Sequence, residues 1–311
     1  MRLKMRRCTM IALLGCFLAV PGLAGAQKPR AELVVFGTSL SDPGNAFALL
    51  GATNTPPDWS VDPFLVPDRP YARGGQHFSN GATWIEQYAG PRGLSASAQP
   101  AFRDAGAKAA NYAVGGARAR AVSNNLHLEL QVAIFLQHVG GTAPSDALYV
   151  VEMGSNDIRD ALATGDASIL NAAAQAIAGN IEQLAAAGAR RFLVWNAPNL
   201  GLTPAILGLG PAAAGFADFL SQTFNFHLDA ALAALPEGIE MARLDVYQKL
   251  ADVVANPQSF GLTEVAAACI TPSVPPFACR NADEYLFWDG IHPTRAVHAI
   301  LAHEAAAVLG Q

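Results

Sequence analysis

Short apolar runs alternate with alanine-rich stretches along most of this chain, and that order restricts the fold more than any other feature. The apolar runs contain many β-branched residues and cover residues 31–36, 147–153, 191–195 and 239–244. Helical spacing follows at 166–187, 211–235 and about 294–309, with Asp166 as an expected N-cap. Strands separated by helices of this length build parallel sheets covered on both faces. We expect an α/β protein, a three-layer α/β/α sandwich with a mainly parallel sheet.

The N-terminal 26 residues have the composition of an export signal. Four basic residues precede an apolar run at 8–20, and the small residues Ala24-Gly25-Ala26 follow it. This order predicts a cleavable signal peptide, a mature chain of residues 27–311 and a secreted or periplasmic location. The alternatives are an uncleaved anchor, for which the run is short of the ~20 residues of a membrane span, and a lipoprotein signal at Cys16.

Charge and composition restrict the partners of the mature chain. The full sequence has 311 residues, with 20 basic and 25 acidic side chains, and the signal removes four basic ones to leave a net charge of −9. An acidic chain is a poor partner for nucleic acid, and no later apolar run is long enough for a membrane span. No repeat, charge block or linker divides residues 27–311, which we interpret as one domain and a monomer.

Cysteine usage agrees with export. Cys8 and Cys16 leave with the signal, so Cys269 and Cys279 are the two that remain. In an oxidising compartment we expect these two to form a disulfide. The chain has no C-x-x-C pair, no H-E-x-x-H, no P-loop and no G-x-G-x-x-G motif. We therefore expect neither a metal nor a cofactor.

The first apolar run ends in Gly37-Thr38-Ser39-Leu40, which places a serine directly after a strand. We interpret Ser39 as lying at the start of a helix, where backbone N–H groups and the helix dipole favour a developing negative charge. Serine is also a common helix cap, so the position alone is a weak indication of a nucleophile. The segment does not match the G-x-S-x-G pattern of α/β-hydrolases.

A base for Ser39 is found near the C-terminus. Asp289 and His292 lie three residues apart in a segment rich in turn-forming residues, so a turn can bring the carboxylate to the imidazole. Five other histidines fall within helical patterns, where packing or solvation explains them, and His77 lies in a loop. The five are His127, His138, His227, His298 and His303.

Donors for an oxyanion are expected in two further segments. Asn156 lies in Gly154-Ser155-Asn156-Asp157, immediately after the second apolar run. The segment 111–117 contains two adjacent glycines, whose backbone N–H groups can approach a substrate closely. Each segment alone is ordinary turn chemistry, whereas together with Ser39, Asp289 and His292 they supply the parts of a serine esterase.

These blocks resemble those of the SGNH or GDSL-type serine hydrolases, in particular the lipase, phospholipase and haemolysin-like branch. The resemblance rests on residues 37–45, 111–117, 154–157 and 289–294, and it covers nearly the whole mature chain. It implies a flavodoxin-like sandwich, with Ser39, Asp289 and His292 as the catalytic triad. It also implies an oxyanion hole formed by Ser39, Gly116 and Asn156, where Gly116 is chosen by its distance from Asn111.

The chain departs from the family pattern at two positions. Thr38 stands where the family has aspartate, although the acid that partners the histidine lies in the 289–292 block. His77 stands where the related segment often has arginine, which bears on the loop or the substrate.

From these features we expect a secreted hydrolase that cleaves a small-molecule or lipid carboxylic ester through an acyl-enzyme, with short- to medium-chain acyl or choline esters as substrates. Phe287 and Trp288 directly precede Asp289 and are expected to line the substrate pocket. The alternatives are an acyltransferase or phospholipase that forms the same acyl-enzyme, and a non-catalytic binding module. The intact set of Ser39, Asp289 and His292 argues against the last.

Overall fold

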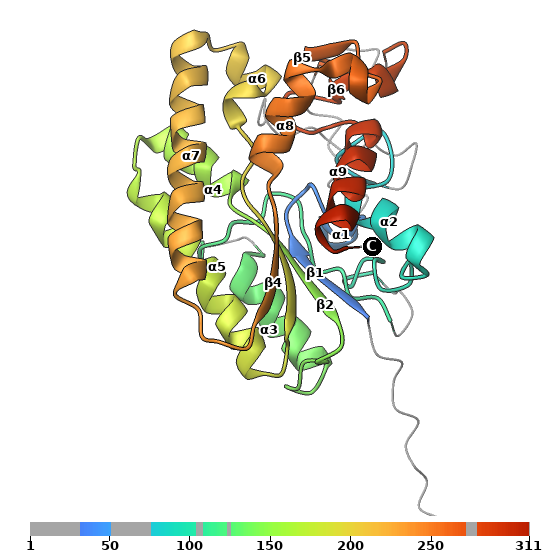
Figure 1. The fold of residues 1–311 in the computed structure, drawn as a ribbon, viewed down its shortest axis with the longest axis vertical. Coiled ribbons are helices and arrows are strands. Elements are labelled where there is room, and N and C mark those ends of the chain that lie inside the picture. Colours follow the sequence, from blue (N-terminus) through green and yellow to red (C-terminus); the bar gives the residue numbers. More distant parts are fainter. Residues whose placement is uncertain (1–31, 51–75, 104–107, 123–125, 272–278, 311) are drawn as a thin grey trace, which may run out of the picture.

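A parallel sheet forms the centre of the molecule. The computed structural model describes residues 32–50, 76–103, 108–122, 126–271 and 279–310 (Figure 1). The four strands are adjacent in chain order, and each pairs in parallel with the next. They are β1 (Leu33–Gly37), β2 (Leu148–Glu152), β3 (Arg191–Trp195) and β4 (Glu240–Leu244). The four apolar runs therefore predicted the strands, with ends that differ by no more than two residues.

Residues 110–114 extend the sheet beyond β1 without forming a regular strand. The Tyr112 N–H donates to the Val35 carbonyl at 2.7 Å, and the Val114 N–H donates to the Gly37 carbonyl at 3.1 Å. Asn111 makes an isolated parallel bridge with Val35. The glycine segment that follows is thereby placed beside the carboxyl end of β1, the edge at which open α/β sheets bind ligands.

In the described part of the chain, helices lie between and after these strands. The segment from β1 to β2 contains α1 (Asn45–Leu50), α2 (Trp84–Ala89) and α3 (Leu128–His138). Between β2 and β4 lie α4 (Ser155–Thr164), α5 (Ser168–Ala186), α6 (Pro204–Leu207) and α7 (Pro211–Ala233). After β4 come α8 (Val246–Ala255), the two-stranded parallel pair β5 (Glu264–Ala268) and β6 (Tyr285–Phe287), and α9 (Arg295–Val308). Short 3₁₀ turns occupy Gly90–Arg92, Leu200–Leu202, Pro257–Phe260 and Ala282–Glu284.

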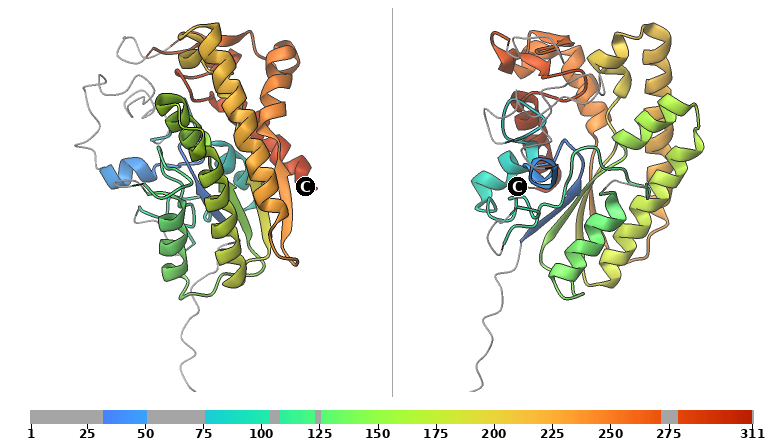
Figure 2. Two further views of the ribbon diagram at one scale, coloured as in Figure 1. Left: turned by 90° about the vertical axis from the view of Figure 1, so that its left-hand side faces the viewer. Right: turned by 180° about the vertical axis from the view of Figure 1, so that it is seen from behind.

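Alternate strand residues enter different cores, as the pleat of a sheet requires. Val34 and Phe36 pack with helices α3, α4, α5 and α7, whereas Leu33 and Val35 pack with α2, α8 and α9. Figures 1 and 2 show helices on both faces of the sheet. The predicted three-layer α/β/α sandwich with a mainly parallel sheet is confirmed.

Several local predictions need correction. Helix α5 begins at Ser168 with Ala167 at the N-cap, and Asp166 instead accepts the Ser168 N–H at 3.0 Å from outside the helix. His127 is the N-cap of α3 and not part of it. Strand β5 was not among the strands expected from the sequence, because its alanines give a weak strand signal.

The structure tests the predicted disulfide but not the predicted signal peptide. Residues 1–26, the predicted signal peptide, lie outside the described residues. Cys269 and Cys279 form a disulfide with 5.4 Å between their Cα atoms. Within the described ranges, every helix is too short or too polar to cross a membrane.

Candidate active site

Ser39 lies in the turn that follows β1. The Ser41 N–H closes this turn on the Thr38 carbonyl at 3.2 Å, and Ser39 itself is half-buried. Helix α1 begins at Asn45, so the expectation that Ser39 starts a helix is wrong. The N-terminal N–H groups of α1 bind the Asp42 side chain, which accepts from Gly44 at 2.8 Å and from Ala46 at 3.0 Å. The dipole of α1 therefore stabilises Asp42 and not a group at Ser39.

The serine of one predicted block lies in contact with the histidine and aspartate of another. His292 Nε2 is 2.9 Å from Ser39 Oγ, although the two residues are 253 positions apart. His292 Nδ1 is 2.7 Å from Asp289 Oδ2, and both side chains are buried. The Asp289 carboxylate fixes the Nδ1–H tautomer, which leaves Nε2 with a lone pair directed at the serine hydroxyl.

Backbone hydrogen bonds hold the 289–292 turn in this shape. Asp289 Oδ1 accepts the N–H groups of Ile291 and His292, each at 2.8 Å. The Trp288 N–H donates to the His292 carbonyl at 2.8 Å. Asp289 thus uses one oxygen for the turn and the other for the imidazole. Three-residue spacing is therefore needed for the turn as well as for the ion pair.

The glycine segment is tied to the turn that carries Ser39. Asp42 Oδ2 accepts the Gly115 N–H at 2.8 Å, so this donor is used within the fold. The next residue, Gly116, has φ of +80°, a conformation that glycine adopts without strain. Burial raises the pKa of Asp42 to about 6, against the effect of its four backbone donors. The candidate oxyanion donor predicted from the sequence, Gly116, lies next to the fixed position of Gly115.

Asn156 reaches the same place from the first turn of α4. Its Nδ2 donates to the Ala117 carbonyl at 2.9 Å, and its Oδ1 accepts from Arg159 at 3.1 Å. The neighbouring Asp157 accepts the Ala119 N–H at 2.8 Å. Burial raises the pKa of Asp157 to about 6. Asn156 and Asp157 therefore hold the loop at Ala117 and Ala119. Asp42 holds the same loop at Gly115.

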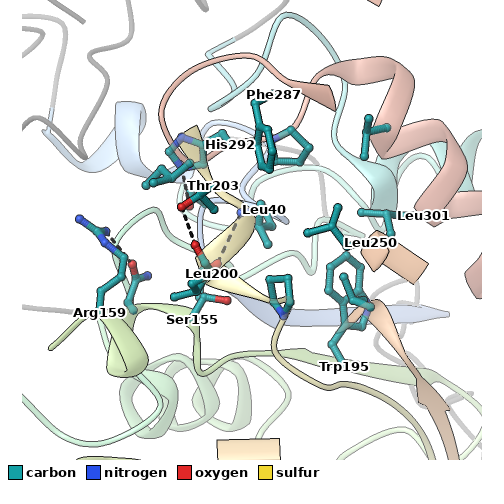
Figure 3. Close-up of a pocket in the computed structure, with 18 of the residues that line it drawn as sticks. Leu40, Ser155, Arg159, Trp195, Leu200, Thr203, Leu250, Phe287, His292 and Leu301 are labelled. Atoms are coloured by element: carbon teal, nitrogen blue, oxygen red, sulfur yellow. Dashed lines mark hydrogen bonds between the residues drawn. The ribbon is translucent and has the colours of Figure 1, made fainter. Parts of the chain in front are cut away.

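A pocket opens directly beside Ser39 and His292. It encloses about 770 Å³ of space between atoms, a volume that includes open solvent at its mouth. Most of its lining is apolar, and β3, α8 and α9 contribute part of it, among them Trp195, Leu250 and Leu301. In Figure 3 these three lie on the opposite side of the pocket from Arg159.

The two aromatic residues before Asp289 have different environments. Phe287 lines the pocket, but Trp288 packs against Cys269 and Ile270 beneath the disulfide and does not belong to the lining. Successive residues of an extended segment point to opposite sides, so the sequence itself held the indication that only one of them faces the pocket. Gly116 is also outside the lining.

Sequence reasoning missed three residues around this site. Arg159 lines the pocket one helical turn after Ser155. Gln131 is fully buried and binds both the N–H and the carbonyl of Gly37, each at 3.0 Å. Glu152 is 2% exposed and contacts Thr38. For Glu152 the sequence did hold a signal. It is a charged residue at the end of an otherwise apolar strand, where an unpaired charge is rarely buried.

The remaining histidine prediction concerns His77. Its Nε2 is 2.8 Å from Glu86 Oε2, a partner on α2, so His77 pairs with an acid outside the pocket. Contact with His77 lowers the pKa of the Glu86 carboxyl, against the effect of burial. Among the described residues, no group of histidine, cysteine or acidic side chains is arranged to hold a metal ion.

The fold and the Ser39–His292–Asp289 contact define a family. The GDSL-like Lipase/Acylhydrolase family model matches residues 33–305 of this chain, which therefore belongs to that family. Members with curated names indicate that the chain is a carboxylic ester hydrolase. The predicted family resemblance is confirmed.

Relatives differ in how much of the chain they match. A phosphatidylcholine-sterol acyltransferase of Aeromonas hydrophila is 25% identical over 96% of both chains. Esterase EstA of Pseudomonas aeruginosa is 30% identical over 94% of this chain, which spans only 49% of that relative. A GDSL esterase/lipase of Arabidopsis thaliana is 35% identical over 39% of this chain and 38% of its own length.

Proposed function

We propose that this protein hydrolyses carboxylic esters with Ser39 as nucleophile, His292 as general base and acid, and Asp289 as the group that orients the imidazole. The hydrogen-bonded series from Ser39 Oγ to His292 to Asp289 carries the proposal, with steps of 2.9 and 2.7 Å. A nucleophile within hydrogen-bond reach of a base, and a third group orienting that base, is the arrangement that covalent acyl transfer requires.

The reaction has two chemically matched halves. His292 Nε2 takes the Ser39 proton while Oγ forms a bond to the ester carbonyl carbon. The tetrahedral intermediate then expels the alcohol, which receives the same proton from His292, and the acyl group remains on Ser39. Water attacks this acyl-enzyme in the second half, and His292 again moves the proton, so that the carboxylic acid leaves and Ser39 is restored.

Three donors hold the negative oxygen of each tetrahedral intermediate in this proposal. They are the backbone N–H groups of Ser39 and Gly116 and the side-chain amide of Asn156. An amide carries two N–H donors, and Asn156 uses one on the Ala117 carbonyl. Because the Asn156 Oδ1 accepts from Arg159, the guanidinium orients the amide and increases its donor strength.

The pocket favours a medium-length acyl chain. Its apolar lining extends from His292 past Leu250 to Leu301, which supplies apolar surface for several methylene groups. Each buried methylene contributes about 0.8 kcal/mol of transfer free energy. Arg159 places a cation at the pocket, so an ester with a quaternary ammonium group such as choline is disfavoured.

A fluorophosphonate probe tests the nucleophile. We expect one equivalent of label on the purified protein and none on Ser39→Ala, with loss of p-nitrophenyl ester hydrolysis by about 10⁶-fold. Ser95→Ala changes an exposed serine outside the site and should label normally. Labelling that persists in Ser39→Ala would exclude the mechanism. A series of esters from acetate to dodecanoate, with choline esters and phospholipids beside it, measures the substrate class.

Transfer of the acyl group to an alcohol is the second candidate. The similarity to a phosphatidylcholine-sterol acyltransferase over 96% of both chains favours it. The acyl-enzyme would be the same, and an acceptor alcohol would replace water in the second half. Product analysis with added long-chain alcohol distinguishes the two, since a transferase forms the new ester in preference to free acid.

The last part of the proposal concerns export of the protein. We infer that residues 1–26 direct secretion and are removed, so that a single domain of residues 27–311 acts as a monomer in the periplasm or outside the cell. The four basic residues, the apolar run and the small residues before Gln27 support this inference. Intact mass of the protein recovered from the periplasm and medium should correspond to a chain that begins at Gln27.

A further inference from the structure

A buried carboxylate at the end of β2 faces the turn that carries Ser39. Glu152 is 2% exposed and pairs in register with Gly37, the last residue of β1. Its Oε2 accepts the Thr38 backbone N–H at 2.9 Å. The Thr38 hydroxyl lies 2.9 and 3.0 Å from the two carboxylate oxygens. One side chain therefore binds both the backbone and the side chain of the residue before Ser39.

The same carboxylate binds the other side of the turn. The Ser41 hydroxyl also hydrogen-bonds Glu152. The Trp84 indole N–H can only donate, and it donates to Ser41 Oγ at 2.9 Å, so the Ser41 proton is directed to Glu152. Residues 38 and 41 are thus anchored on one group, and Ser39 lies between them. Burial raises the pKa of Glu152 to about 7, against the effect of these donors.

We propose that Glu152 is a positioning residue that holds the Ser39 turn, and that it replaces from β2 the carboxylate which a Gly-Asp-Ser-Leu sequence carries at position 38. The proposal rests on Ser39 being the nucleophile. Thr38 suits this arrangement because its hydroxyl donates to Glu152. Aspartate there would place a second carboxylate in contact with the first in a site closed to water, where two like charges cannot both be ionised. Thr38 and Glu152 therefore belong together.

A coupled set of variants tests this pairing. Glu152→Gln keeps the volume but loses an acceptor, and we expect kcat for a p-nitrophenyl ester to fall roughly 10- to 100-fold while KM changes little. Thr38→Asp alone should lower kcat by a similar factor. Thr38→Asp combined with Glu152→Gln restores one carboxylate and one neutral partner, and its kcat should recover to within about fivefold of the unmodified protein.

Conservative and matched controls separate positioning from stability. Thr38→Ser keeps the hydroxyl and should keep kcat within about threefold, whereas Thr38→Val removes it and should lower kcat about tenfold. Glu304→Gln breaks an ion pair with Lys249 outside the site and should affect only the melting temperature. The rate of fluorophosphonate labelling of Ser39 should fall in parallel with kcat.

Two results would overturn the proposal. One is kcat of Glu152→Gln within twofold of the unmodified protein. The other is a double variant no better than the product of the two single effects. If Glu152→Gln fails to fold, Thr38→Val decides alone, and an unchanged kcat there rejects the role. Activity that survives in Ser39→Ala would instead refute the nucleophile assignment, so the two failures are distinguishable.

Discussion

The two walls of the pocket are built in different ways. The polar wall, formed by Ser39, Asn156 and Arg159, follows the carboxyl ends of β1 and β2, and hydrogen bonds fix its side chains. The apolar wall, formed by Trp195, Val246, Leu250, Val297 and Leu301, is held by packing between β3, α8 and α9. A hydrogen-bonded position accepts few residue types, whereas a packed position accepts several of similar volume. We infer that the polar wall determines the reaction and the apolar wall determines the acyl chain.

Asp289→Asn acts behind the polar wall, through His292, and should cause a larger loss than the changes at Asn156 and Leu250 described next. The amide can present an N–H to His292 Nδ1, which reverses the tautomer and removes the lone pair from Nε2. We expect kcat to fall about 10⁴-fold for all chain lengths alike. Steady-state kinetics with acetate and octanoate esters measures it. Equal circular dichroism spectra control for folding, and a loss confined to one chain length would contradict the assignment.

Asn156→Ala tests the oxyanion side of the polar wall. Loss of one donor should lower kcat by about 10²- to 10³-fold, with KM changed little because the donor acts mainly on the tetrahedral oxygen. Asn156→Asp provides the sharper control, since it keeps the size but replaces the donor with an acceptor. A variant whose KM rises while kcat stays constant would show that Asn156 binds the ground state instead.

Leu250→Phe should change the apolar wall alone. The larger side chain shortens the pocket beyond His292, so kcat/KM for octanoate and longer esters should fall roughly tenfold while acetate is hydrolysed at the original rate. Leu250→Met, of similar volume, is the matched control and should retain the chain-length profile. An equal loss for every ester would mean that the two walls are not independent.

The same difference explains how much the sequence could predict. Ser39, Asn156, Asp289 and His292 lie in short blocks whose spacing is required by local turns, and the structure brings the four blocks together. The turn at Ser39 was mistaken for a helix start because Asp42 binds the first N–H groups of α1. The apolar wall was not predictable, since leucines and valines from distant elements carry no spacing that marks a pocket.

The smallest expected effect concerns stability and not activity, and it arises at His298. This residue is buried on α9, next to Val297 of the apolar wall. Its Nδ1 accepts the Trp84 N–H at 3.2 Å, and burial lowers its pKa to about 3, with help from His77 and His292. In the unfolded chain this histidine binds a proton near its ordinary pKa of 6.5, so its contribution to stability is present above pH 6.5 and is lost as pH falls. Between pH 6.5 and 5 the loss is roughly 2 kcal/mol.

His298→Gln keeps an acceptor for Trp84 but does not titrate. Asp42, Glu152 and Asp157 have raised pKa values, so they favour the folded state as pH falls and oppose the effect of His298 in both proteins. The difference in melting temperature between the variant and the unmodified protein cancels their contribution. We expect this difference to shift in favour of the variant from pH 7 to pH 5. Parallel melting curves across that range would mean that His298 is protonated equally in the folded and unfolded chains.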